Sequence, residues 1–443
     1  MRIPRKYRPA IVAAAEGLVL VLSLAWCRSF GEAPFYAAVP AFLVYLVLVR
    51  PKAFRKLSWK HVVYFGFLAV LVGGYLAVFA CMATTMRVSW AELPLALYFL
   101  ASLHILLWLI DRGLTAVFSR VLRPVGRLMK RRTRTAAATI LRATAMFLVG
   151  GPLVAASLST HWLKFSESAD PGDLCGMPFE EAGFTSADGL QLRGWFIPSS
   201  GGTSDMTVIA VPGAGMNRLN LLEHAMVLRE SWFNVFLVDL RGQGASEGHV
   251  RGFGAAEAQD VTAAVNYLRQ TRPSASRHVY ALGVGQGAAA VLAAARNDPR
   301  IEALVLDSLV PSPATEIDRL TEWIPWPLGR YFRQATLLAA SAQLGHNLFE
   351  QSAADDLAAL SSQPVLMVHG KCDSLVSVQE AEAVYAASRT PTMFWIVAGA
   401  GHGQSISQCP EGYSKMATSM FKAVRMKLSP FCWAALKPSA REG

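Results

Sequence analysis

The sequence predicts two parts: an apolar, all-α N-terminal region, and behind it an α/β domain whose mainly parallel sheet carries helices on both faces. Two observations predict this division. Most of the apolar excess of the 443-residue chain, which is 53% hydrophobic, lies in its first third. From about residue 164 the long apolar runs give way to short strand-like runs that alternate with helical stretches. We therefore expect a transmembrane region over residues 1–162 and an α/β domain over 163–443.

Five apolar runs in the first part are each about long enough to cross a hydrocarbon core of roughly 30 Å as a helix. They cover residues 10–27, 34–49, 61–83, 92–110 and 143–162. Between and before these runs, the stretches 1–8, 28–33, 50–60, 84–92 and 111–134 hold four, one, five, one and eight Lys or Arg residues. The positive-inside rule then predicts a plasma-membrane protein with a cytoplasmic N-terminus, an extracytoplasmic α/β domain and membrane lipids as partners. If one run does not span, the domain lies on the cytoplasmic side.

Charge follows the same division. Residues 1–162 hold 20 Lys/Arg and four Asp/Glu, a net charge of +16, whereas the remainder holds 22 and 27, a net charge of −5. The positive charges of the chain thus lie beside apolar runs and not on a soluble domain. Nucleic acid is therefore not expected as a partner.

The α/β domain is predicted element by element. Two alternating runs meet at Asp188-Gly189, a hairpin signal. Strands are then expected at 207–211, 234–239, 279–282, 301–307, 364–369 and 393–397. Helices are expected at 219–231, 255–270, 378–387 and 413–428, with an alanine-rich helix directly after the strand at 279–282. Residues 309–360 break this rhythm and are predicted to be an insertion.

Five short motifs stand at the ends of these strands. "VPGAG" covers 211–215, "DLRGQGASEG" 239–248, "LGVGQGAA" 282–289, "VHGKCDSLV" 368–376 and "GAGHGQ" 399–404. The third combines a strand, a glycine-rich turn and a helix, the layout of a nucleophile elbow G-x-S-x-G. The apex of that turn should be a serine, and here it is Gly285.

The ordered set of motifs resembles the α/β-hydrolase superfamily over most of residues 180–430. The opening "ADGLQLRGWFIP" at 187–198 is similar to membrane-anchored serine hydrolases of the lipase, esterase and acyltransferase-like kind. The resemblance implies an α/β-hydrolase fold with a cap insertion at 309–360. It also implies small apolar ester, thioester or amide ligands and no cofactor.

Carried over to single residues, the resemblance implies Asp373 as the acid and His402 as the general base. It implies the backbone N–H groups of Ala214 and Gln286 as the oxyanion donors. These roles suit acyl transfer, because a histidine must take the nucleophile's proton, a carboxylate must orient the imidazole, and two donors must meet the developing negative oxygen. Gly285 occupies the position of the missing nucleophile.

Four hypotheses follow from Gly285. The favoured one is a pseudohydrolase that binds a ligand or partner without turnover, and "GVGQGA" resembles the noncatalytic N-myc downstream-regulated branch, which also has glycine at the apex. In the second, Asp373 and His402 activate a water molecule. In the third, Ser308 or Cys372 is the nucleophile.

The fourth hypothesis is a dinucleotide site. "GVGQGA" also matches G-x-G-x-x-A after a strand, and Asp307 ends the next strand about 20 residues further on, as a ribose-binding carboxylate would. No metal motif of the H-E-x-x-H kind and no P-loop occurs in the sequence. Metal ligands and cofactors are therefore not expected.

Two further questions stay open in the sequence. Cysteines at 175, 372, 409 and 432 are compatible with free thiols or with one or two disulfides. The aromatic segment "TEWIPWPLGRYF" at 321–332 predicts at least one apolar wall, either lining an acyl site or packing against the core.

Overall fold

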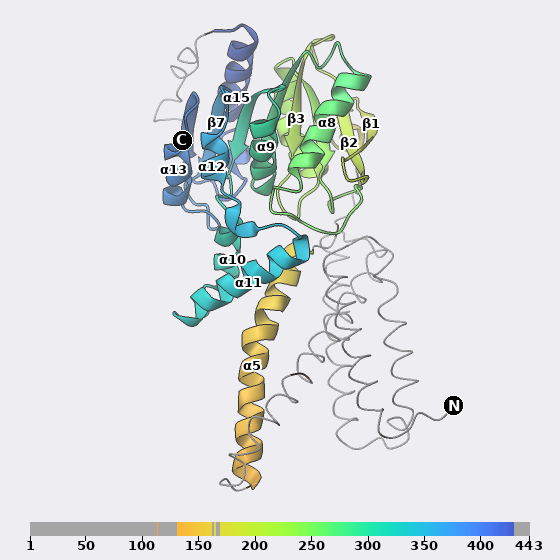
Figure 1. Cartoon of the computed structure of the whole chain (residues 1–443). Helices are drawn as coiled ribbons and strands as arrows, with labels where there is room; N and C mark the ends of the chain where they lie inside the picture. Colours follow the sequence, from red (N-terminus) through yellow and green to blue (C-terminus); the bar gives the residue numbers. More distant parts are fainter. Residues whose placement is uncertain (1–112, 114–130, 162–163, 165–168, 429–443) are drawn as a thin grey trace, which may run out of the picture. The chain divides into compact units, whose positions relative to one another are not determined.

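The computed structural model describes residues 113, 131–161, 164 and 169–428 (Figure 1). The chain divides into two compact units. One comprises Met1–Ser159 with Ile324–His346, and the other comprises Thr160–Trp323 with Asn347–Gly443. The first four predicted membrane spans, at 10–27, 34–49, 61–83 and 92–110, lie outside the described residues.

An eight-stranded sheet forms the centre of the second unit, with the strand order β1-β2-β4-β3-β5-β6-β7-β8 (Figure 1). β2 is antiparallel to both β1 and β4, and all other neighbouring pairs are parallel. The predicted α/β fold with a mainly parallel sheet is therefore confirmed. The strands are β1 (Glu180–Thr185), β2 (Gln191–Ile197), β3 (Met206–Val211), β4 (Asn234–Asp239), β5 (His278–Val284), β6 (Ile301–Asp307), β7 (Val365–Gly370) and β8 (Thr392–Val397).

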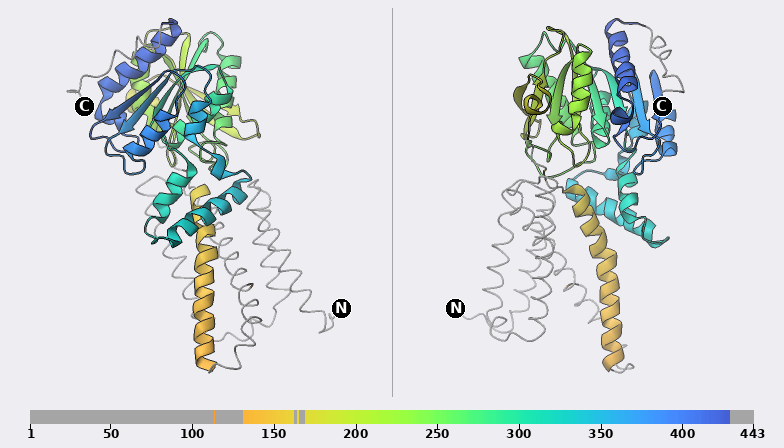
Figure 2. Two further views of the ribbon diagram at one scale, coloured as in Figure 1. Left: turned by 60° about the vertical axis from the view of Figure 1, so that its left-hand side comes forward. Right: turned by 180° about the vertical axis from the view of Figure 1, so that it is seen from behind.

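Helices cover both faces of this sheet, as the two views in Figure 2 show. On one face lie α8 (Ala258–Thr271), α9 (Gln286–Asn297), α12 (Ala353–Ala358) and α13 (Val378–Ala386). On the other lie η2 (Arg218–Leu221), α7 (Leu222–Glu230), α14 (Ser405–Gln408) and α15 (Pro410–Arg425). The unit also contains α6 (Pro171–Cys175), α10 (Pro313–Thr321) and η3 (Leu348–Glu350).

Side chains along each strand point alternately to the two faces of the sheet and so contribute to a hydrophobic core on each face. In β6, Leu304 and Leu306 pack on the first face, whereas Ala303 and Val305 pack on the second. This is the period of two that side chains have along a strand, and it explains why a central strand buried on both faces reads as a continuous apolar run. The predicted strands 234–239 and 301–307 coincide with β4 and β6.

The predicted hairpin is also present. β1 and β2 pair antiparallel around the turn at Asp188-Gly189, where Gly189 has a φ of +91°. Such a φ is easily reached by glycine, which has no Cβ. The Ser186 N–H donates a hydrogen bond to the Leu190 carbonyl oxygen at 2.9 Å and closes the turn.

The described part of the first unit consists mainly of α5 (Arg131–Thr160) and α11 (Leu328–Leu344). The fifth predicted span, 143–162, falls on α5. Among the described residues, no helix is both long enough and apolar enough to cross a membrane.

α11 packs along α5. The rings of Phe147 and Phe332 have centroids 4.8 Å apart, and a Cβ placed on Gly151 would lie 2.6 Å from the Phe332 ring. The Tyr331 hydroxyl donates to the Leu148 carbonyl oxygen at 2.8 Å. The small residue in α5 therefore leaves the room that an aromatic side chain from α11 fills.

This packing bears on the aromatic segment at 321–332. Phe332 is buried, but Trp323 and Trp326 are 70% and 81% exposed. The predicted apolar wall is thus made by Phe332 against α5, and the two tryptophans take no part in a described core.

Candidate active site

The elbow lies between β5 and α9, at the edge where the parallel strands of the sheet end. Gly285 forms its apex with φ +56° and ψ −118°, and its N–H donates to the Asp307 carbonyl oxygen at 2.8 Å. The flanking glycines are required by close contacts, because a Cβ on Gly283 or Gly287 would lie 2.4 Å from a backbone oxygen of Gly287 or Pro212 respectively. Sterics therefore explain the glycines of "GVGQG".

Asp373 and His402 form a hydrogen-bonded pair, and the loops that carry them follow β7 and β8. His402 Nδ1 lies 2.8 Å from Asp373 Oδ2. The Asp373 side chain is fully buried, and its Oδ1 accepts hydrogen bonds from the N–H groups of Leu375 and Val376 at 2.8 and 2.9 Å. Burial raises the pKa of Asp373, but the hydrogen bonds from His402 and from these N–H groups outweigh it and leave the pKa below its usual value.

The free edge of the imidazole faces the elbow. A Cβ placed on Gly285 would lie 2.9 Å from His402 Nε2. The three residues Gly285, Asp373 and His402 therefore come together as predicted, in spite of the long sequence separation between them. The imidazole is oriented by the carboxylate on its Nδ1 side, and Nε2 points to the place where an elbow side chain would begin.

The two predicted oxyanion donors flank the same point. Ala214 follows Gly213, whose Cα lies 3.9 Å from the Cβ position on Gly285, and Gln243 Nε2 fixes this loop by donating to the Gly213 carbonyl oxygen at 2.8 Å. Gln286 is the first residue of α9, where backbone N–H groups have no partner within the helix. Both donors thus belong to segments next to the apex.

A buried cluster that sequence reasoning missed holds the histidine loop. Ser308 Oγ accepts a hydrogen bond from the N–H of Gly403 at 2.9 Å and donates to Asp307 Oδ1 at 3.1 Å. Ser405 Oγ donates to the same carboxylate oxygen at 2.9 Å. Ser308 has a φ of +52°, which is uncommon for a residue with a Cβ. Only the position of Ser308 at a strand end hinted at this role.

The contacts of these residues argue against two of the hypotheses drawn from the sequence, the dinucleotide site and the alternative nucleophile. The Asp307 side chain is completely buried and is held by Ser308 and Ser405, so it does not present a carboxylate to the ribose of a dinucleotide. Burial raises the pKa of Asp307 to about 6. Ser308 Oγ is engaged with the Gly403 N–H, and Cys372 is exposed, so neither is placed as a nucleophile by a contact with His402.

A second network, likewise missed, links Gln286 to α10. Arg251 Nε donates to Gln286 Oε1 at 2.5 Å, and the same guanidinium forms an ion pair with Glu316. The Gln286 side chain is 2% exposed. Arg251 therefore connects the side chain of Gln286, a candidate oxyanion residue, to α10.

The turn-like motif at 239–248 is structural. Asp239 is fully buried and accepts hydrogen bonds from the N–H groups of Arg218 and Ala245 at 2.8 and 3.0 Å. Ser246 Oγ donates to the Asp239 carbonyl oxygen at 2.7 Å. The hydrogen bonds of this motif therefore hold neighbouring loops below the site in place. Within the described part of the chain, no group of three His, Cys, Asp or Glu residues is arranged to hold a metal ion.

The strand order, the elbow and the Asp–His pair define an α/β-hydrolase type of protein, and comparisons with known proteins agree. A family model described as serine aminopeptidase, S33, matches residues 202–357. The uncharacterized protein YfhR of Escherichia coli O157:H7 is 30% identical over 233 residues, which are 52% of this chain and 75% of YfhR. The α/β-hydrolase domain-containing protein WAV2 of Arabidopsis thaliana is 25% identical over 221 residues, 48% of this chain and 68% of WAV2.

Among solved structures, the Pyrococcus furiosus esterase Pf2001 has a TM-score of 0.49 and 22% sequence identity, and the alignment covers 58% of this chain and 97% of the esterase. The chain belongs to the α/β-hydrolase family that it shares with YfhR.

Proposed function

We propose that the α/β domain is a pseudohydrolase: it binds a small apolar ester or acyl ligand between the elbow and His402 without forming an acyl-enzyme. The observation that carries the proposal is Gly285 at the apex of the elbow, where the family's nucleophile stands. Loss of the nucleophile from a triad costs on the order of 10⁶ in turnover. The N–H groups of Ala214 and Gln286 remain available in this proposal to hold a carbonyl oxygen.

A second candidate function is hydrolysis by an activated water. The observation that favours it is the assembled Asp373–His402 pair, whose Nε2 faces the position left empty by the missing side chain. A water bound at Nε2 would give its proton to His402 and attack a carbonyl held by the oxyanion donors. The carbonyl–leaving-group bond would break, and the imidazolium would return the proton to the leaving group.

Ester hydrolysis by the full chain separates the two candidates. Wild type is compared with Gly285→Ser, with Gly285→Ala as the matched control that adds the same Cβ without a hydroxyl, and with His402→Ala. The pseudohydrolase proposal expects an inert wild type, an inert Gly285→Ala variant and measurable turnover by Gly285→Ser. A wild type whose activity is lost in His402→Ala supports water activation and refutes the pseudohydrolase.

We further propose that the protein is membrane-bound and that its lipid-like ligands come from the bilayer. The support is in the sequence: the apolar runs at 10–27, 34–49, 61–83 and 92–110 alternate with basic segments. With a cytoplasmic N-terminus, an odd number of crossings places the α/β domain outside the cytoplasm, as the sequence predicts, and an even number places it inside. A C-terminal alkaline phosphatase fusion, active only outside the cytoplasm, measures which holds. Recovery of the chain from the soluble fraction would refute membrane attachment.

A further inference from the structure

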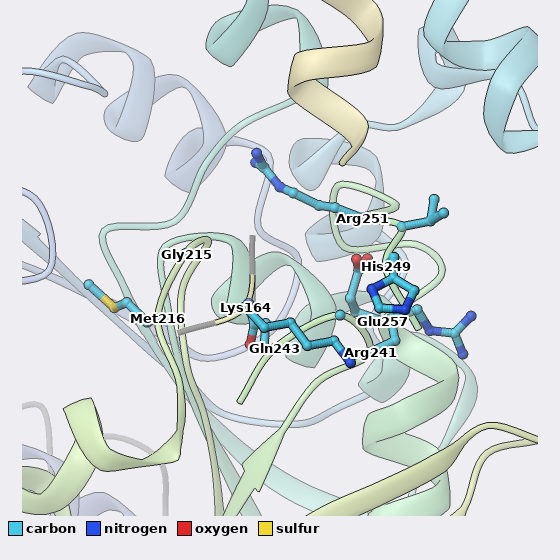
Figure 3. Close-up of a pocket in the computed structure, with 10 residues that line it drawn as sticks. Lys164, Gly215, Met216, Arg241, Gln243, His249, Arg251 and Glu257 are labelled. Atoms are coloured by element: carbon cyan, nitrogen blue, oxygen red, sulfur yellow. The ribbon is translucent and has the colours of Figure 1, made fainter. Parts of the chain in front are cut away.

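A pocket lies beside the two segments that carry the candidate oxyanion donors (Figure 3). It measures about 370 Å³, including the part open to solvent. Its walls come from the loop after β3, from the loop after β4 and from the chain just beyond α5. The residues used below are Lys164, Arg241, Gln243, His249 and Glu257. The roles assigned to Asp373 and His402 involve none of these side chains.

Two side-chain atoms in this pocket are buried and lack a hydrogen-bond partner among the described residues. They are Gln243 Oε1 and His249 Nδ1. The orientation of the Gln243 amide is fixed, because its Nε2 donates to the Gly213 carbonyl oxygen at 2.8 Å. A buried polar atom without a hydrogen-bond partner is unfavourable, so a ligand or a water molecule is expected beside each of these two atoms. Gln243 Oε1 can only accept a hydrogen bond, which means that the missing partner is a donor.

The charged groups around these atoms are engaged with one another or with the backbone. The Arg241 guanidinium binds Asp260 and Asp188, both at 2.7 Å. Glu257 accepts hydrogen bonds from the N–H groups of Gly252 and Gly254. The pocket is therefore not a simple cationic hollow for an anion, in spite of its Lys and Arg side chains.

His249 itself is neutral. Burial, together with the nearby charge of Lys164, lowers the pKa of His249 to about 4. A neutral imidazole has one donating and one accepting nitrogen. Lys164 Nζ donates to the Ser246 carbonyl oxygen at 2.7 Å and brings an ammonium group to the same wall. The residues that line the pocket thus include both hydrogen-bond acceptors and donors.

We propose that this pocket binds the hydroxyl groups of a neutral polyol or sugar. A hydroxyl is both donor and acceptor, so two of them can donate to Gln243 Oε1 and His249 Nδ1 while accepting from neighbouring donors. A carboxylate or a phosphodiester has no O–H group at neutral pH, offers only acceptors and would leave Gln243 Oε1 unpaired. Because Gln243 also fixes the Gly213 carbonyl, the bound group lies against the candidate oxyanion loop, yet the site does not depend on turnover at His402.

The test uses the full chain in lipid nanodiscs, which avoid sugar-based detergents. Saturation-transfer NMR is recorded with glycerol and with 1-propanol, which has the same carbon number and one hydroxyl, and ³¹P line broadening is recorded with inorganic phosphate. The compared proteins are wild type, His249→Phe, His249→Asn and His402→Ala. Asparagine can place a polar atom near the position of Nδ1, whereas phenylalanine cannot.

We expect glycerol to give a saturation-transfer signal at least threefold stronger than 1-propanol in wild type, in His249→Asn and in His402→Ala. In His249→Phe, with an unchanged melting temperature, the glycerol signal should fall at least threefold. Equal signals from the two alcohols, a glycerol signal that is the same in His249→Phe, or broadening of phosphate without a glycerol signal would each overturn the proposal. Loss of ester binding in His402→Ala with glycerol binding retained distinguishes this site from the proposed hydrolase site.

Discussion

At the scale of single residues, Gly285 combines two costs for any side chain. Its φ of +56° disfavours a Cβ, and that Cβ would lie 2.9 Å from His402 Nε2. Gly176 has a similar φ of +61° but nothing within 4 Å of its Cβ position. We expect Gly176→Ala to cost about 1 kcal/mol of unfolding free energy and Gly285→Ala to cost more, about 2 kcal/mol. Urea unfolding of both variants measures the difference, and equal costs would show that the imidazole moves away freely.

Asp307 is a second residue for which we make a prediction, here about how the unfolding free energy depends on pH. Its folded-state pKa of about 6 lies above the ordinary 3.8, so the folded chain binds more protons than the unfolded chain between these values. This group's contribution to the unfolding free energy therefore falls as pH rises from about 4 to about 6. An asparagine lacks this titration.

We expect the stability of Asp307→Asn relative to wild type to rise by up to about 3 kcal/mol from pH 4 to pH 7. Denaturant unfolding at both pH values measures it. A difference between the two proteins that does not change with pH would contradict the raised pKa.

At the scale of elements, local pattern predicted most of the sheet and not the partners of its helices. β4 and β6 each end in four apolar residues followed by an aspartate, so their C-terminal limits are readable from the sequence. The contact between α5 and α11 joins residues about 180 positions apart, and no local period encodes it. Gly151 is consistent with a helix breaker in the sequence, but in the structure it makes room for Phe332.

The candidate site follows the same division. Gly285, Asp373 and His402 were predictable together because each belongs to a loop at the end of a strand, and parallel strands end at one edge. The roles of Ser308 and Arg251 were not predictable. Each depends on the path of another loop, the histidine loop for Ser308 and the first turn of α9 for Arg251.

The packing of α11 on α5 can be tested by substituting one buried and one exposed residue of α11. Phe332 is 4% exposed and packs on Phe147, whereas Leu338, on the same helix, is 66% exposed. We expect Phe332→Ala to cost about 3–5 kcal/mol of local stability and to make residues 328–344 several-fold more sensitive to limited proteolysis. Leu338→Ala is the matched control and should be cleaved like wild type. Similar cleavage of both variants would contradict the described packing.

At the scale of the whole molecule, the domain should be sensitive to acid because it buries neutral histidines. His224 is 3% exposed, its ring lies 5.3 Å from that of Tyr413, and neither ring nitrogen has a partner among the described residues. Burial lowers the pKa of His224 to about 4, below the ordinary 6.5. Between these values the unfolded chain binds more protons than the folded one, so the unfolding free energy falls as pH falls. Asp307 acts in the opposite direction over part of this range.

Replacing His224 by phenylalanine removes its titration and keeps an aromatic ring beside Tyr413. We expect His224→Phe to retain up to about 3 kcal/mol of the stability that wild type loses between pH 6.5 and pH 4, and hence to unfold at a lower pH. Acid titration followed by circular dichroism gives the midpoint. Asp307→Asn should shift the stability–pH curve the other way, because it lacks the carboxyl whose protonation favours the folded state. Identical acid midpoints for wild type and His224→Phe would mean that His224 is already protonated, or already exposed, in the folded protein.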